Sequence, residues 1–202
     1  EDVSSTEGLG KLDTPNAANV TATCEDVDED GDLDLLFLQT TDQTDGVLLL
    51  ENLGFGRFTS SHLPARGLGA GGHHTTTVLH EDIDADSVQD FLLLSSNKPP
   101  LLLHGESQNA LRDISAQSGL AITGDTHSAW LVDQNNDSLP DLIAVDRKLG
   151  VRAWRNLGNN QFSEASGDFG FGQANRGAQS LVSAASLTDL DGNGSMELLT
   201  CP

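Results

Sequence analysis

The chain has 202 residues and carries 31 acidic against 10 basic side chains, a formal net charge of −21 at pH 7. This acidic balance argues against nucleic acid and anionic membranes as direct partners, because both would repel it. No apolar stretch reaches about 18 residues, so no membrane-spanning helix is predicted. The chain starts at Glu1, without an initiator methionine or a signal peptide, and we therefore expect a processed chain or a fragment.

A strand pattern recurs along the chain in units of about 50 residues. The opening segment 1–9 resembles 112–120, so we expect it to be the last strand of a preceding repeat. The following repeats are predicted at 17–62, 73–116, 126–166 and, as a first half only, 179–202.

Each complete repeat contains four short strands. First strands are expected at 20–24, 75–79, 128–132 and 181–185, and purely apolar second strands at 35–38, 91–94, 142–145 and 198–199. Third strands are expected at 47–50, 101–104 and 151–154, and fourth strands at 58–60, 111–114 and 162–165. An Asn-Leu-Gly hairpin with a closing Phe links third to fourth strand at 51–58 and 155–162, and the motif is degraded at 104–111.

Four antiparallel strands in about 50 residues are typical of one blade of a β-propeller. Each blade needs neighbours to cover its two faces. We therefore predict an all-β fold of about three and a half blades within 1–202. Such a piece would have open sheet edges, so we expect it to be part of a larger propeller, or alternatively a ring completed by another chain.

Between the first and second strand of each repeat lies an acidic run of nine residues. The runs are Asp26–Asp34 (run 1), Asp82–Asp90 (run 2), Asp133–Asp141 (run 3) and Asp189–Glu197 (run 4). Their first residues lie 56, 51 and 56 positions apart (82 − 26, 133 − 82, 189 − 133). Four runs in register next to apolar strands are poorly explained as solvated turns, because such close carboxylates repel one another without a counter-ion.

Alternate positions of each run predict a site for a hard cation. Positions 1, 3, 5, 7 and 9 are Asp26, Asp28, Asp30, Asp32 and Asp34 in run 1; Asp82, Asp84, Asp86, Val88 and Asp90 in run 2; Asp133, Asn135, Asp137, Leu139 and Asp141 in run 3; and Asp189, Asp191, Asn193, Ser195 and Glu197 in run 4. Position 7 varies freely, as expected where only its backbone carbonyl is used. Six or seven oxygens suit Ca²⁺, in up to four sites, with Mg²⁺ as second choice. No run contains Cys or His, which argues against zinc and copper.

The EF-hand is the obvious competitor, since its loop also uses alternate oxygens, but it requires a bidentate Glu at position 12. Position 12 would here be Phe37, Leu93, Ala144 and Thr200. The runs therefore join two strands, and the position 9 ligand begins the second strand. At position 6, run 1 has Gly31, whereas Ser87 and Ser138 in runs 2 and 3 predict a strained loop or a lower affinity.

These four runs, with the hairpins at 52–58 and 156–162 and the related links at 2–9 and 113–120, resemble the FG-GAP/VCBS repeat family. The family includes the integrin α-subunit propeller and the cartilage acidic protein group. The resemblance implies a propeller, typically of seven blades, with Ca²⁺ between the first two strands of a blade. Ser87, Ser138 and Glu197 depart from the pattern and put equal occupancy of the sites in doubt.

The function we expect is a noncatalytic, calcium-stabilised scaffold that binds a protein or glycan on one propeller face, with other blades as further partners. Sites of modest affinity would fill at extracellular calcium levels, which favours a secreted protein or the outer face of a membrane protein. The alternatives are the propeller module of a carbohydrate-active enzyme and a glycan-binding, lectin-like protein. The sequence contains neither Gly-x-Ser-x-Gly nor His-Glu-x-x-His, and no Tyr.

A few other side chains have two interpretations each. Trp130 and Trp154 could stack on sugars, but core packing is the stronger prediction. The cluster of His73, His74 and His80 could bind zinc, although solvated histidines in a link are more common. The segment 169–172 (Phe-Gly-Phe-Gly) is a recognition loop or a plug, and Cys24 and Cys201 are either joined as a disulfide or remain free buried thiols.

Overall fold

The protein is described here from a computed structural model. The structure describes residues 20–27, 30–40, 45–66, 75–95, 99–106, 110–147, 149–171, 184–193 and 196–201. The expected strand at 1–9 lies outside these residues.

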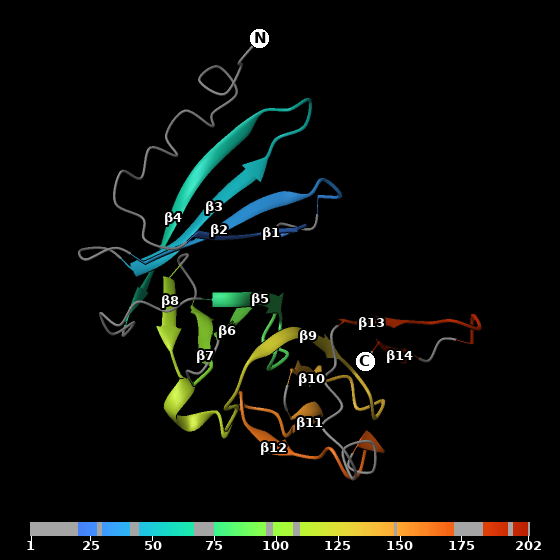
Figure 1. Ribbon diagram of the computed structural model, residues 1–202. Coiled ribbons are helices and arrows are strands. Elements are labelled where there is room, and N and C mark those ends of the chain that lie inside the picture. Colours follow the sequence, from blue (N-terminus) through green and yellow to red (C-terminus); the bar gives the residue numbers. More distant parts are fainter. Residues whose placement is uncertain are drawn as a thin grey trace.

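Every regular element in the described residues is a strand, apart from one 3-10 turn, η2 (Ser115–Gln117) (Figure 1). The first blade has β1 (Val20–Glu25), β2 (Asp34–Thr40), β3 (Asp45–Asn52) and β4 (Phe58–Arg66). The second has β5 (Thr75–Glu81), β6 (Asp90–Ser95), β7 (Leu101–Glu106) and β8 (Ala110–Asp113). The third has β9 (Thr126–Val132), β10 (Asp141–Asp146), β11 (Gly150–Asn156) and β12 (Phe162–Glu164), and a half blade has β13 (Ala184–Thr188) and β14 (Glu197–Cys201). No helix in the described part of the chain has the length and apolar character needed to cross a membrane.

Consecutive strands within each blade pair antiparallel. The blades follow one another through their first strands, because β1 lies against β5, β5 against β9 and β9 against β13 (Figure 1). A short parallel bridge between β4 and β8, at Ala65 with Leu111 and Arg66 with Arg112, also joins the outer edges of the first two blades. The prediction of an all-β fold with about three and a half four-stranded blades is confirmed.

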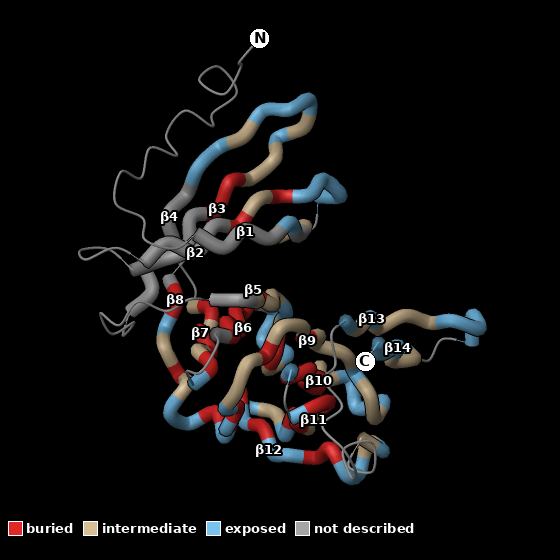
Figure 2. The backbone as a smooth tube through the Cα atoms, viewed as in Figure 1, coloured by how far each residue is buried: buried red, intermediate tan, exposed pale blue. Residues whose placement is uncertain are grey.

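The hydrophobic core lies between the blades rather than within them (Figure 2). Successive side chains of a strand point to opposite faces, so each central strand contributes to two interfaces. On β6, Leu92 packs in the cluster that contains Leu142 of the third blade, whereas Phe91 and Leu93 pack in the cluster that contains Leu36 of the first. Sheets covered on both faces explain why the second strands are continuously apolar.

Two predicted strands end more than two residues away from the observed ends. The first strand of the half blade continues to Thr188, beyond the predicted end at 185, because its pairing with β14 continues until Thr188 faces Glu197; positions 181–183 of that prediction lie outside the described residues. The fourth strand of the first blade extends from 58 to Arg66, beyond the expected end of that blade at 62, because it pairs along most of β3. In β14, Leu199 is exposed, whereas Leu198 packs on the cluster shared with the third blade.

Candidate metal sites in the acidic loops

Each acidic run forms the loop between the first and second strand of its blade, as the sequence predicts. The strand pair that closes each loop has the same register in all four. The closing pairs are Glu25 with Asp34, Glu81 with Asp90, Val132 with Asp141 and Thr188 with Glu197. Position 9 is therefore the first residue of the second strand in every case.

The carboxylate at position 1 holds the loop closed from inside. In run 3, Asp133 accepts N–H groups from Asp137 at 3.1 Å and from Ser138 at 2.8 Å. Asp26 and Asp82 accept the equivalent N–H groups, of positions 5 and 6, at 2.8 to 3.0 Å. These bonds tie the turn of each loop to the side chain at position 1.

The carboxylate at position 9 is an anchor that joins the acidic loop and the second strand to the third strand. Asp34, Asp90 and Asp141 are all 0% exposed. In each, one oxygen accepts the N–H of position 2 and the other accepts an N–H of the third strand. The donors are Val27 and Asn52 for Asp34, Ile83 and Gly105 for Asp90, and Gln134 and Asn156 for Asp141. Position 9 thus has a structural role in addition to the predicted ligand role.

The backbone of the loops turns through left-handed conformations at positions 4 and 6. Ser87 and Ser138 at position 6 have φ of 67° and 68°, and Gly31 has 94°. Positive φ at these serines confirms the predicted strain, since side chains other than Gly pay a steric cost there. Ala85 at position 4 also has a φ of 62°, which the sequence did not signal.

Burial changes the acidity of three loop carboxylates. Desolvation raises the pKa of Asp90 to about 6, although N–H bonds from Gly105 and Ile83 and the nearby His104 act in the opposite direction. Desolvation, followed by the charge of Asp86, raises the pKa of Asp84, and desolvation also raises the pKa of Asp141. A cation among these groups would relieve the cost of their charge.

The structure brings the side chains of alternate positions together in runs 2 and 4. The groups whose ligand atoms lie within 4.8 Å of one another are Asp82, Asp84 and Asp86, then Asp189, Asp191 and Glu197, and then Asp84, Asp90 and His104. These clusters could hold a metal ion. Two of the predicted ligands lie outside the described residues: Asp28 at position 3 of run 1 and Ser195 at position 7 of run 4.

Run 4 keeps the same plan with a longer anchor. Glu197 accepts the N–H of Leu190 at 2.8 Å, as the shorter Asp at position 9 does in the other runs. Asp189 accepts N–H groups from Gly192 at 2.7 Å and Asn193 at 3.1 Å. The substitution of Glu for Asp at position 9 therefore preserves the bond to position 2.

Run 2 is covered by the third blade. The side chain of Asn156 donates across the interface to the carbonyl of Ile83 at 2.8 Å and, within its own blade, to that of Pro140 at 3.1 Å. Asn160, in the same hairpin, donates to the carboxylate of Asp84. Sequence reasoning identified this hairpin but did not place it on the neighbouring acidic loop.

His104, which sequence reasoning also missed as a site residue, lies at the inner side of run 2. It aligns with Glu51 and Arg155, and the alignment of the hairpins is the signal that could have found it. The following residue must be Gly105, because a Cβ there would lie 2.3 Å from the carbonyl oxygen of Gln89. The Asn of the other two hairpins cannot occupy this position, which explains the degraded motif in the second blade.

The tryptophans and the Phe-Gly-Phe-Gly segment, which the sequence offered as possible ligand-binding residues, pack in the core instead. Trp154 is 1% exposed and Trp130 packs on the cluster between the third blade and the half blade, which confirms core packing. Phe169 and Phe171 pack on that same cluster, as a plug would.

The histidine cluster is described only in part, and the cysteines differ from the expectation. His73 and His74 lie outside the described residues, and the ring of His80 packs on Phe91 with centroids 4.9 Å apart. Cys24 and Cys201 are not joined in a disulfide, and both are exposed. The expectation of buried thiols is therefore wrong, because Cys24 on β1 and Cys201 on β14 lie outside the hydrophobic clusters described for the first blade and the half blade.

Comparison with known proteins agrees with this geometry over part of the chain. No curated protein matches the sequence. Residues 133–200 match the family described as FG-GAP-like repeat. The match begins at position 1 of run 3 and ends within β14, so it contains two complete acidic loops and, between them, strands β10 to β12 of the third blade. Residues 133–200 are thus similar to an FG-GAP-like repeat, and this similarity covers about a third of the chain.

Proposed function

We propose that this chain is a calcium-stabilised β-propeller scaffold without catalytic activity, which presents its loops to a protein or glycan partner outside the cell. The observation that carries the proposal is the repeated loop itself. Every blade places an oxygen-rich turn between its first two strands, with the same closing pair and the same anchor at position 9. A feature kept in every blade serves the framework rather than one reaction site.

The chemistry of the loops favours Ca²⁺ among the metals. Hard cations take carboxylate, amide and carbonyl oxygens, and Ca²⁺ accepts six to eight of them in irregular geometry. The oxygen Oδ1 of Asp84 is buried and has no hydrogen-bond partner, so it is available to a cation. The exposed Asp86 and Asp137 at position 5 face solvent at the mouth of their loops, where an ion can enter.

Bound calcium would stabilise the blades through the loops. The ion would offset the repulsion among carboxylates and tie position 1 to position 9, and thereby the first strand to the second. Since the site forms only when the chain folds, the free energy of binding adds to that of folding. At a free concentration of 100 times the Kd, one site contributes about 2.7 kcal/mol.

The test is the thermal unfolding of the chain in millimolar Ca²⁺ and in excess chelator. We expect the chelator to lower the Tm by about 5–10 °C for each site emptied, given about 2–4 °C per kcal/mol for a domain of this size. Asp137→Asn should reduce the calcium effect, whereas Asp168→Asn, an exposed carboxylate outside the loops, should leave it unchanged. An identical Tm with and without calcium would show that the loops do not need the ion.

A further inference from the structure

The second blade differs from the others in the residue that its third strand places against the acidic loop. The equivalent residues are Glu51, His104 and Arg155, each directly before the residue whose N–H binds the position 9 carboxylate. Among these three, only the imidazole of His104 is a nitrogen donor for transition metals. Run 2 is therefore lined by a nitrogen as well as by oxygens.

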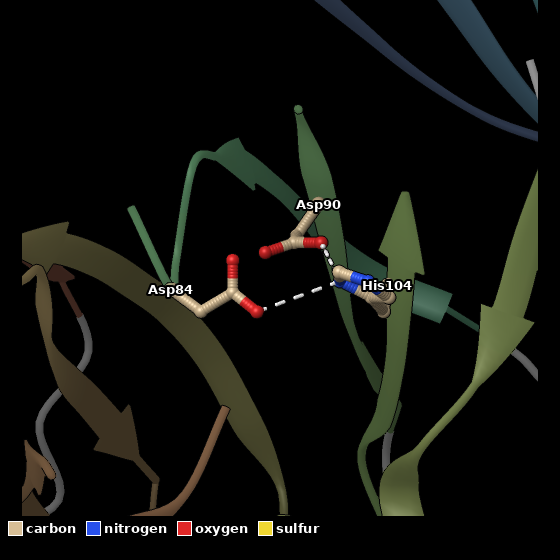
Figure 3. A group of neighbouring side chains, drawn as sticks. All are labelled: Asp84, Asp90 and His104. Carbon is tan, nitrogen blue, oxygen red and sulfur yellow. Dashed lines mark hydrogen bonds and ion pairs between the residues drawn. The ribbon is translucent and has the colours of Figure 1, made fainter. Parts of the chain in front are cut away.

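The nitrogen of His104 lies where two carboxylates converge (Figure 3). Its Nδ1 atom is 3.0 Å from Oδ1 of Asp90 and 3.7 Å from Oδ2 of Asp84. Bonds of about 2.0–2.1 Å around a tetrahedral Zn²⁺ place neighbouring ligand atoms roughly 3.3 Å apart. The observed spacings bracket that value, so small side-chain adjustments would complete the geometry.

A buried amide from the third blade closes the same space. Asn160 is 6% exposed, its Nδ2 atom contacts the carboxylate of Asp84, and the same atom is 3.4 Å from Nδ1 of His104. Its oxygen, Oδ1, is buried without a hydrogen-bond partner. A buried polar atom left without a partner is costly, and such atoms in folded proteins are rare. A half turn of the amide would bring this oxygen to the carboxylate and imidazole, where a cation would satisfy it.

We propose that Asp84, Asp90, His104 and Asn160 form a site for a divalent first-row transition metal ion, of which Zn²⁺ is the best match. One nitrogen and three oxygens meet the four-coordinate preference of Zn²⁺, and they fall short of the six to eight oxygens that Ca²⁺ takes. Asp84 and Asp90 are also positions 3 and 9 of run 2, so Zn²⁺ and Ca²⁺ exclude each other there. The ion would join the second blade to the third, because Asn160 comes from the third.

This inference goes beyond calcium stabilisation and does not depend on it. The test is a zinc titration of the whole chain by calorimetry in calcium-free buffer, with metal analysis after dialysis. We expect His104→Gln to lose one equivalent of Zn²⁺ relative to the unaltered chain. His127→Gln is the matched control, because His127 is a half-buried histidine whose Nδ1 pairs with Ser128 rather than with an acidic loop, and it should retain that equivalent.

Two further measurements keep the proposal open to refutation if His104→Gln folds poorly. Asn160→Ala should weaken the same equivalent by tenfold or more, and Co²⁺ should give the intense visible absorption of a four-coordinate complex in the unaltered chain but not in His104→Gln. Equal zinc binding by His104→Gln and the unaltered chain would overturn the proposal, and so would the absence of zinc binding by the unaltered chain. Neither result bears on the calcium effect, which is measured with chelator and Asp137→Asn.

Discussion

Runs 2 and 3 have the same backbone and different surroundings. In both, position 1 accepts the N–H groups of positions 5 and 6, position 9 is fully buried, and position 6 is a serine with positive φ. Run 2, however, is contacted by His104 and covered by the hairpin of the next blade, whereas the third blade has Arg155 in the place of His104. The arginine contacts Phe169 and Asp168.

This difference shows that two groups of positions in the nonapeptide have different roles. Positions 1 and 9 build the loop, since their oxygens are bound by backbone N–H groups in each of these runs. The side chains at positions 3 and 5, our proposed ligands, bond instead within the loop or to a neighbouring blade, as Asp84 illustrates through its contact with Asn160. The same framework can therefore hold sites of different composition, set by the third strand and by the adjacent blade.

The largest expected effect comes from removing an anchor at position 9. Asp141→Ala leaves the buried N–H groups of Gln134 and Asn156 without an acceptor, so we expect a loss of about 3–5 kcal/mol in the free energy of unfolding. Asp90→Ala should cost a similar amount if the two loops share one framework. Urea unfolding in excess chelator measures both.

Asp137→Ala is the control for these anchors, because position 5 is exposed and the donors to its carboxylate, the N–H of Leu139 and the side-chain amide of Asn135, both lie in its own loop. We expect a loss of about 1 kcal/mol. If the exposed variant cost as much as the anchor variants in the absence of calcium, the division between framework and ligand positions would be wrong.

The features of the fold and of the loops that can be predicted from the sequence are those that repeat locally along the chain. The period of the acidic runs and the apolar second strands predict the blade, the loop and the start of β6 at Asp90, because each depends on residues close in the chain. The contact of Asn160 with Asp84 depends on residues 76 apart on different blades. Nothing within either segment encodes that meeting.

The role of His104 likewise could not be predicted from the sequence. The residues next to His104 in the sequence indicate only a degraded hairpin. The position of His104 beside the acidic loop depends on the close approach of β7 to Gln89, which Gly105 allows. A pattern of residue types predicts which positions face the core, but a close backbone approach of this kind appears only once the strands are placed side by side.

The next effect concerns pH and distinguishes the second blade from the third. His80 in β5 occupies the place of Leu131 in β9, and burial lowers the pKa of His80 to about 4, although the charge of Asp34 acts to raise it. Below a pH of about 6.5, the unfolded chain takes up a proton that the folded chain refuses until about pH 4. Stability therefore falls as the pH drops through this window.

His80→Leu copies the third blade and removes that proton uptake. Between pH 6.5 and pH 4, we expect the free energy of unfolding of His80→Leu to fall by on the order of 2 kcal/mol less than that of the unaltered chain. Urea unfolding of both proteins in chelator, at a series of pH values, measures this difference. The raised pKa of Asp90, about 6, acts in the opposite direction and is common to both proteins, so it largely cancels in the difference. Parallel pH profiles would mean that His80 takes up its proton equally well in the folded state.

The smallest expected effect tests whether the two loops are strained alike. Ser87 and Ser138 both hold a positive φ, which costs a side chain about 1–2 kcal/mol and glycine almost nothing. Glycine also has more freedom in the unfolded chain, which offsets roughly 0.5–1 kcal/mol of the relief. Ser87→Gly and Ser138→Gly should therefore each raise the free energy of unfolding by about 0.5–1 kcal/mol, whereas Ser163→Gly, in the ordinary strand β12, should lower it by a similar amount. If the glycine substitution raises the free energy of unfolding at position 138 and lowers it at position 163, the strain lies in the loop conformation itself. If it lowers the free energy of unfolding equally at both positions, the left-handed turn costs the serine nothing.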